Sequence, residues 1–195
     1  MHARSGVGHH SPVWIWDRAR QQQEPQKFAD EDRVSYLRSL VFTFGEFEAA
    51  DELVDPLMAA GRFSEAVIVA HHVTSDRYDL LARLDHRLDT PELLTRAITQ
   101  LERCAADAEQ DEDPGDYENA ADALAALLHR RGLLDQLLTR ADAGDFFASF
   151  RAADILVDRG RADEAIRVLE DQADRDGPYD EMAREKAVRI EQNRN

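Results

Sequence analysis

The sequence predicts an all-α protein: a short right-handed α-solenoid of stacked helix hairpins, preceded by a largely irregular N-terminal segment. From Asp30 onward, apolar side chains recur at spacings of three and four residues, the period of an amphipathic helix. Glycines separate successive apolar stripes, as they do where a helix ends. No hairpin dipeptide lies between alternating apolar runs, so we expect almost no strand.

Composition limits the class of protein. Of 195 residues, 43% are hydrophobic, which is enough to supply a core. The chain has 24 basic and 40 acidic side chains, and its net charge of -16 repels nucleic acids and anionic membranes. No window holds eighteen apolar residues, and the N-terminus lacks an apolar signal region. A single cysteine, Cys104, cannot form an internal disulfide. We therefore expect a cytoplasmic protein with no membrane association, no direct nucleic-acid binding, and a basic partner.

Residues 1–28 form the predicted irregular N-terminal segment. They contain both tryptophans, Trp14 and Trp16, and two of the six prolines, with no sustained helical period. Two large apolar side chains in a polar segment must be covered by something. Either they fold back and cap the exposed end of the first helix pair, or they anchor a partner or a neighbouring subunit. Trp14 and Trp16 are therefore candidate partner-binding residues, and the segment is compatible with a homo-oligomer.

Residues 29–110 are predicted to form N-terminal helical hairpins. Glycine joints are expected near Gly45 and Gly61. A further helix begins around residue 90, where either Asp89 caps it with Glu92 reaching back, or Thr90 caps it with proline at the first helical position. The apolar face of that helix is predicted to consist of Leu94, Ala97, Leu101, Cys104 and Ala108.

Residues 111–116 are predicted to be an acidic linker. The surrounding stretch, "DAEQDEDPGDYE" at 107–118, has seven carboxylates and no basic residue. Pro114-Gly115 predicts a turn that would break a helix. A calcium loop beginning at Asp111 would need a ligand at its fifth position and glycine at its sixth, but the order there is Gly115 and Asp116. We therefore interpret the stretch as a solvated connection between two helical halves.

Residues 117–195 are predicted to form C-terminal helical repeats. In "DFFASFRAADILVDRG", one apolar stripe runs from Phe146 to Val157, and Gly160 ends the helix. A second stripe begins at Ala162, so the pair reads as an αα-hairpin. A last helix begins with Pro178 in its first turn. Its apolar stripe is predicted to be Tyr179, Ala183, Ala187 and Ile190. Each pair leaves one apolar face that the next pair covers, which is how an α-solenoid is built.

Several short stretches of the chain resemble a known family. "GRFSEA" at 61–66 and "GRADEA" at 160–165 resemble the start of the second helix in tetratricopeptide repeats. "AADILVDRGRADEAIRVLEDQAD", together with "RADAGD" at 140–145, is similar to the degenerate tetratricopeptide-like repeats of many bacterial regulatory proteins. The family's Trp-Leu-Gly-Tyr pattern in the first helix is missing. The resemblance implies a protein-interaction scaffold.

The sequence contains no recognisable catalytic, cofactor or metal signature. It has no Gly-x-Ser-x-Gly elbow, dinucleotide fingerprint or Walker sequence. None of the residues three positions before His71, His72, His86 and His129 can ligate a metal, which excludes a Glu-x-x-His di-iron site. Cys104 lies on an apolar stripe, where burial would suppress its reactivity. We therefore expect no enzyme activity, no cofactor and no metal.

Phe146, Phe147 and Phe150 are the remaining candidate partner-binding residues. Phe146 and Phe147 are adjacent and cannot both face the same stripe, so one of these two is expected to line a groove. The favoured hypothesis is a non-catalytic scaffold that binds a basic protein or peptide along an acidic concave face. Two alternatives stay open: an acidic inhibitor or immunity-type protein that mimics nucleic acid, and an all-helical enzyme with an unrecognised site.

Overall fold

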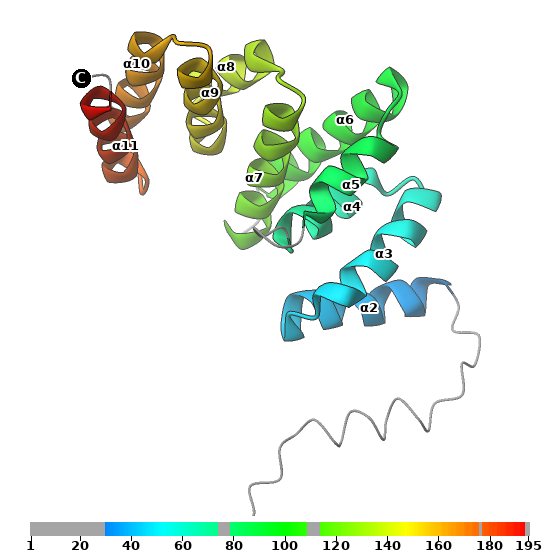
Figure 1. Cartoon of the computed structure of the whole chain (residues 1–195). Coiled ribbons are helices and arrows are strands. Elements are labelled where there is room, and N and C mark those ends of the chain that lie inside the picture. The colour runs from blue at the N-terminus through cyan, green and yellow to red at the C-terminus, as the bar shows by residue number, and fades with distance from the viewer. Residues whose placement is uncertain (1–29, 74–78, 109–113, 176, 194–195) are drawn as a thin grey trace, which may run out of the picture.

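A computed structural model describes residues 30–73, 79–108, 114–175 and 177–193. Within these ranges the chain forms ten helices and no strand, which confirms the all-α prediction (Figure 1). The N-terminal segment with Trp14 and Trp16, and most of the predicted acidic linker, lie outside the described residues. The helices are α2 (Asp30–Phe44), α3 (Phe47–Ala59), α4 (Phe63–His72), α5 (Leu80–Arg87), α6 (Pro91–Ala108), α7 (Pro114–Arg130), α8 (Leu134–Asp142), α9 (Phe146–Asp158), α10 (Ala162–Ala173) and α11 (Asp180–Gln192).

The helices follow one another in an elongated, curved row, with α2 and α3 at one end and α10 and α11 at the other (Figure 1). Most neighbours in sequence pack directly against each other, including α2 on α3, α8 on α9 and α10 on α11. Longer-range packing joins α4 to α6 and α7, and α7 to α9. The apolar face of one helix is thus covered by helices adjacent in the row.

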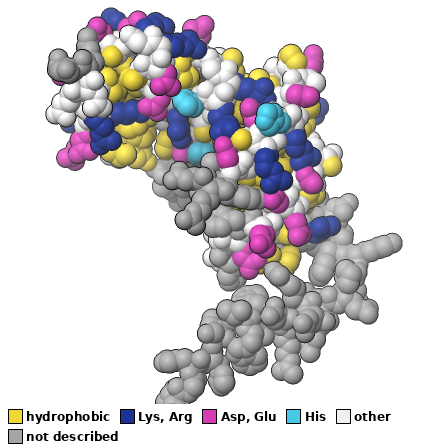
Figure 2. Space-filling view, in the orientation of Figure 1, with side chains coloured by type: hydrophobic (Ala, Val, Ile, Leu, Met, Phe, Trp, Pro, Cys, Tyr) yellow, Lys and Arg dark blue, Asp and Glu magenta, His cyan; other side chains and the backbone are white. Residues whose placement is uncertain are grey.

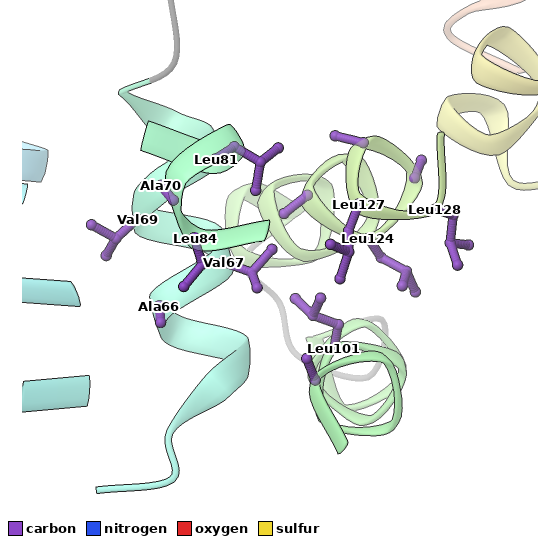
Figure 3. Packing of buried hydrophobic residues seen from close by; sticks show 14 of the residues in the cluster. Ala66, Val67, Val69, Ala70, Leu81, Leu84, Leu101, Leu124, Leu127 and Leu128 are labelled. Carbon is purple, nitrogen blue, oxygen red and sulfur yellow. The ribbon is translucent and has the colours of Figure 1, made fainter. Parts of the chain in front are cut away.

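One fully buried part of the core lies where α4, α5, α6 and α7 meet (Figure 3). Val67, Leu84 and Leu101 contribute side chains that are at most 1% exposed. Alanines such as Ala66 and Ala97 allow close approach of the helices because they add little bulk. Of residues 120–128 in α7, all but Asp122 are buried, and α7 contacts α4, α6, α8 and α9. A helix that is apolar around most of its circumference belongs in the interior.

Four glycine joints end helices with one repeated geometry. Gly61, Gly132, Gly144 and Gly160 all have positive φ, between 64° and 97°. In each case the amide of the following residue donates to the carbonyl five residues earlier, as Arg161 does to Leu156 at 2.8 Å. This is the Schellman arrangement, which turns the chain back after a helix. Gly61 and Gly160, which the sequence predicts as joints, therefore do end helices in this way, whereas the amide after Gly45 donates to the carbonyl of Leu40, six residues earlier.

Two helices begin at residues other than those predicted from the sequence, and the structure identifies which of two predicted residues caps α6. α7 begins at Pro114, so the last three residues of the predicted 111–116 linker are helical. Proline is tolerated at this position because a backbone N–H in the first turn would make no hydrogen bond within the helix. α11 begins at Asp180 with Tyr179 as its N-cap, two residues after Pro178. Thr90 caps α6: its hydroxyl accepts from the amide of Leu93 at 3.3 Å.

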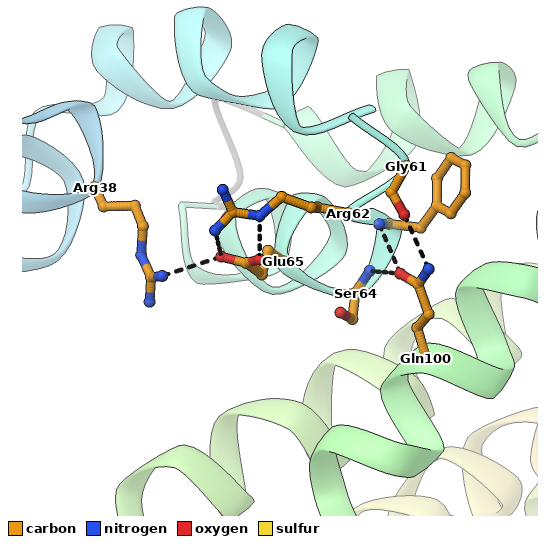
Figure 4. A network of polar contacts seen from close by, with 7 residues as sticks. Arg38, Gly61, Arg62, Ser64, Glu65 and Gln100 are labelled. Carbon is orange, nitrogen blue, oxygen red and sulfur yellow. Dashed lines mark hydrogen bonds and ion pairs between the residues drawn. The ribbon is translucent and has the colours of Figure 1, made fainter. Parts of the chain in front are cut away.

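A side-chain cap fixes α4 on α6 (Figure 4). The Gln100 amide oxygen accepts from the backbone N–H groups of Phe63, at 2.8 Å, and Ser64, at 3.1 Å. Its amide nitrogen donates to the carbonyl of Gly61 at 2.9 Å. The first-turn N–H groups of α4 have no intrahelical acceptor, so a residue of α6 supplies one. Nearby, Glu65 pairs with Arg62 and with Arg38 of α2.

Candidate functional site

The candidate site is a groove between α9 and α11, bounded by the C-terminal end of α7. Its volume is about 670 Å³, which lies within the usual range for ligand-binding clefts. Three helices that are separated in sequence supply its walls. The lining residues are His129 from α7; Phe150, Asp154, Val157 and Asp158 from α9; and Met182, Glu185, Lys186, Arg189, Ile190 and Asn193 from α11 and its C-cap.

Apolar side chains in the groove are open to solvent. Val157 is 39% exposed and Met182 is 51% exposed, while Phe150 and Ile190 are half-buried. Figure 2 shows hydrophobic side chains at the surface over this end of the molecule. Large apolar groups that stay uncovered within a concave surface mark binding sites more often than scattered exposed residues do.

Lys186 ties α11 to α9 within the groove. Its ammonium lies 2.8 Å from a carboxylate oxygen of Asp154 and donates to the carbonyl of Phe150 at 2.9 Å. It also lies 4.6 Å from the centre of the Phe150 ring, a cation–π contact. Because only 20% of its side chain is exposed, this lysine fixes the spacing of the two helices.

Charged groups at the groove rim are mixed in sign. Asp158 and Glu185 are exposed, and neither forms an ion pair within the described part of the chain. Arg189 stands on the same exposed side of α11. The rim therefore offers two carboxylates to a cationic ligand, whereas Asp154 is already neutralised by Lys186.

His129 lies at the α7 side of the groove. Burial lowers the pKa of this imidazole below its ordinary value of 6.5, and the charge of Arg151 lowers it further. The carboxylates of Asp154 and Asp158 act in the opposite direction and do not outweigh these effects. His129 is therefore predominantly neutral at neutral pH.

A polar cluster beside the groove connects α4, α7 and α9. The Asp122 carboxylate lies 2.8 Å from Nε2 of His71 and 3.4 Å from a guanidinium nitrogen of Arg151. Burial alone would raise the pKa of Asp122, but the hydrogen bond and charge of His71, together with Arg151, lower it below 3.8. Asp122 is thus held ionised at the only position of 120–128 that is not fully buried.

The predicted phenylalanines form one aromatic cluster. Phe146 is buried and stacks on Tyr179, with ring centres 4.2 Å apart and planes at 19°. Phe147 meets Phe146 edge-on at 5.3 Å. Phe150 lies 4.2 Å from Phe146 and is the member of the predicted trio that lines the groove. Through Tyr179, which caps α11, the cluster fixes the start of α11 against α9.

Most of the other groove residues were not singled out from the sequence. Met182 belongs to an ordinary helical segment, and Val157 was predicted only as the end of an apolar stripe; the exposure of both depends on how α9 and α11 pack. Lys186 offered one signal, since it is one of only two lysines among 24 basic residues.

Clusters of metal-ligating side chains and membrane-spanning helices are both absent from the described residues. Nowhere in these ranges do three or more histidine, cysteine, aspartate or glutamate side chains converge as metal ligands would. Across the same ranges, no helix combines the length and apolarity needed to span a membrane. Comparison with known proteins gave no matching family model, no similar curated protein and no similar solved structure.

Proposed function

We propose that this protein is a short tetratricopeptide-like α-solenoid that acts as a non-catalytic interaction scaffold in the cytoplasm. Its partner is a protein or peptide segment with apolar and basic side chains. The observation that carries the proposal is the groove between α9 and α11, where uncovered apolar side chains adjoin exposed carboxylates.

The repeated joints support the solenoid part of the proposal. Four glycine joints share the Schellman geometry, and α7 to α11 follow one another along the row, each in contact with the next (Figure 1). Repeat proteins of this kind present an extended concave surface to their partners. Placing the binding surface on the α9–α11 side agrees with the part of the chain where the family resemblance is clearest.

The groove chemistry suggests how a partner is recognised. An aliphatic or aromatic side chain of the partner would cover Met182, Val157 and Phe150. An arginine or lysine beside it would meet Asp158 and Glu185, which have no ionic partner within the described ranges. The net charge of -16 would speed the approach of a cationic segment.

The arrangement of carboxylates favours this function over mimicry of nucleic acid. The acidic face of α3 is neutralised from neighbouring helices: Asp51 pairs with Arg83, Asp55 with Arg87, and Glu52 with Arg33. Figure 2 likewise shows acidic and basic side chains interspersed over the visible face. A phosphate mimic requires a row of unneutralised carboxylates instead.

Calorimetric titration with peptides tests the proposal. The probes are synthetic peptides that carry an aromatic pair followed by two arginines, with matched peptides in which glutamate replaces arginine. Met182→Glu should weaken binding by about tenfold or more, because it places a charge where about 1.5–3 kcal/mol of apolar burial is expected. Val188→Glu is the matched control, since Val188 is also 51% exposed on α11 but does not line the groove.

Two results would contradict the proposal. One is equal loss of affinity in the Met182 and Val188 variants, which would place binding outside the groove. The other is no binding of either peptide set while duplex DNA competes with this protein for a DNA-binding protein, which would favour mimicry instead.

A further inference from the structure

The two helices that wall the groove run in the same direction with their starts level. Tyr179, the N-cap of α11, stacks on Phe146, the first residue of α9, at 4.2 Å. About two turns further along both helices, the ammonium of Lys186 meets the carboxylate of Asp154 at 2.8 Å. Both contacts join residues that are 32 or 33 positions apart in the sequence. α9 and α11 are therefore parallel and share one register.

This register divides the groove into two apolar subsites. Met182 of α11 stands level with Phe150 of α9, one turn before the lysine–aspartate pair, and these two residues form the first subsite. Ile190 of α11 stands level with Val157 of α9, one turn after that pair, and these form the second subsite. The ion pair bridges the groove between the two subsites.

The spacing of the subsites matches two turns of a helix. Val157 follows Phe150 by seven positions and Ile190 follows Met182 by eight, which places the subsites about 10–12 Å apart. In a partner helix, residues i and i+7 lie about 10.5 Å apart on one face. An extended segment fits less well, because residues three apart point to opposite faces and residues four apart lie about 13 Å apart.

The position of α10 leaves the groove side of the two helices open. α10 packs on both α9 and α11 but supplies none of the residues that line the groove. The groove therefore lies on a face of the α9–α11 pair that α10 does not cover. A helix lying there would contact side chains of both walls, as neighbouring helices of this protein do.

Charges around the groove define the rest of the partner helix. Lys186 and Asp154 neutralise each other between the subsites, so the partner residues above them need no charge. Asp158 beside the second subsite and Glu185 beside the ion pair are exposed, and neither forms an ion pair within the described ranges. Their charge favours basic side chains on the flanks of the partner helix.

We propose that the groove binds an amphipathic helix of a partner protein, with large apolar side chains at positions i and i+7. Small residues lie between these two positions, and basic residues flank them. The inference rests on the proposed function, because it defines the partner of the same groove. One large side chain enters each apolar subsite, and basic side chains pair with Asp158 and Glu185. The ion pair between the subsites sets the spacing that the partner must match.

Calorimetric titration of the full chain with three synthetic peptides tests this inference. The first carries two leucines seven positions apart on an alanine and arginine background. In the second the leucines are five positions apart, which places them on different faces of a helix, and in the third a proline between them prevents a helix. The first should bind at least about tenfold more tightly than the others, because only it fills both subsites. Carbon-13 chemical shifts of the labelled first peptide should be helical in the complex.

Two groove variants assign a subsite to each leucine. Met182→Glu alters the first subsite, Val157→Glu alters the second, and Val188→Glu is the control outside the groove. Each groove variant should bind the first peptide about tenfold more weakly, and the control should bind it as the wild type does. Of two peptides that each retain a single leucine, one should respond only to Met182→Glu and the other only to Val157→Glu. Circular dichroism verifies that every variant keeps its helical content.

The outcomes separate this inference from the function on which it rests. Equal binding of the peptides with leucines seven and five positions apart would overturn the inference and leave groove binding intact. Full affinity of the proline peptide, or single-leucine peptides that respond alike to both substitutions, would do the same. Failure of every basic, apolar peptide to bind, helical or extended, would contradict the proposed function itself.

Discussion

Single glycines determine where the chain reverses direction. Gly160 has φ of 73°, and a Cβ added there would meet no atom within 4 Å. Gly177 has equal space but does not occupy the left-handed region. The two positions therefore separate the cost of backbone conformation from the cost of a steric clash.

Gly160→Ala should lower the free energy of unfolding by about 1–2 kcal/mol, since an L-residue is strained at positive φ. Gly177→Ala should leave it unchanged or raise it slightly, because alanine reduces the freedom of the unfolded chain. Urea denaturation of the two variants measures both effects. Equal destabilisation by the two substitutions would show that the joint geometry described for Gly160 is incorrect.

His129 should make stability depend on pH. Its folded-state pKa lies below 6.5, so the unfolded chain binds a proton first as the pH falls. The contribution of neutral His129 to the free energy of unfolding is fully present above pH 6.5. It is lost as the pH falls through the pKa of His129 in the folded protein. Between about pH 7.5 and about pH 5.5, His129→Gln should therefore reduce the pH-dependent loss of unfolding free energy. If the unfolding free energy of the His129 variant fell with pH as steeply as that of the wild type, the lowered pKa of His129 would be contradicted.

At the scale of elements, α7 connects the two halves of the row. It contacts α4 and α6 on one side and α8 and α9 on the other, and its Asp122 reaches both His71 and Arg151. The apolar run of α7 explains why it lies centrally, but nothing local in the sequence indicates that Asp122 would meet a histidine 51 residues earlier.

A double-mutant cycle between Asp122 and His71 measures this connection. The alanine variants should show a coupling energy of about 0.5–3 kcal/mol, as residues in direct polar contact do. The same cycle for Arg103 and Asp107, an exposed pair 3.6 Å apart within α6, should give a value near zero. Additive effects for Asp122 and His71 would mean that α4 and α7 are not coupled through this contact.

The sequence predicted helix ends better than it predicted the groove. Gly45, Gly61 and Gly160 were identifiable because the reversal is a local property of the backbone. The start of α7 was misplaced because proline followed by glycine is compatible with both a turn and a first helical turn. Met182, Val157 and His129 come from three helices, and their convergence depends on packing angles that no local pattern encodes. Phe150 was a candidate together with Phe146 and Phe147, but the argument from adjacent aromatic residues applied to Phe146 and Phe147, neither of which lines the groove.

At the scale of the whole molecule, an elongated row leaves side chains uncovered along its length and at its ends (Figure 1). Met182 and Val188 are equally exposed on α11, but only Met182 belongs to a concave surface shared with α9. We therefore place the proposed partner binding on one side of the α9–α11 end and not on exposed apolar residues in general.

Amide NMR spectra of the full chain, recorded during titration with a basic, tryptophan-containing peptide, test this claim most directly. We expect the changes in amide chemical shift to concentrate in α9, α11 and the last turn of α7, with His129 and Met182 among the residues affected. Changes concentrated on α3 and α5, or no changes at saturating peptide, would contradict it.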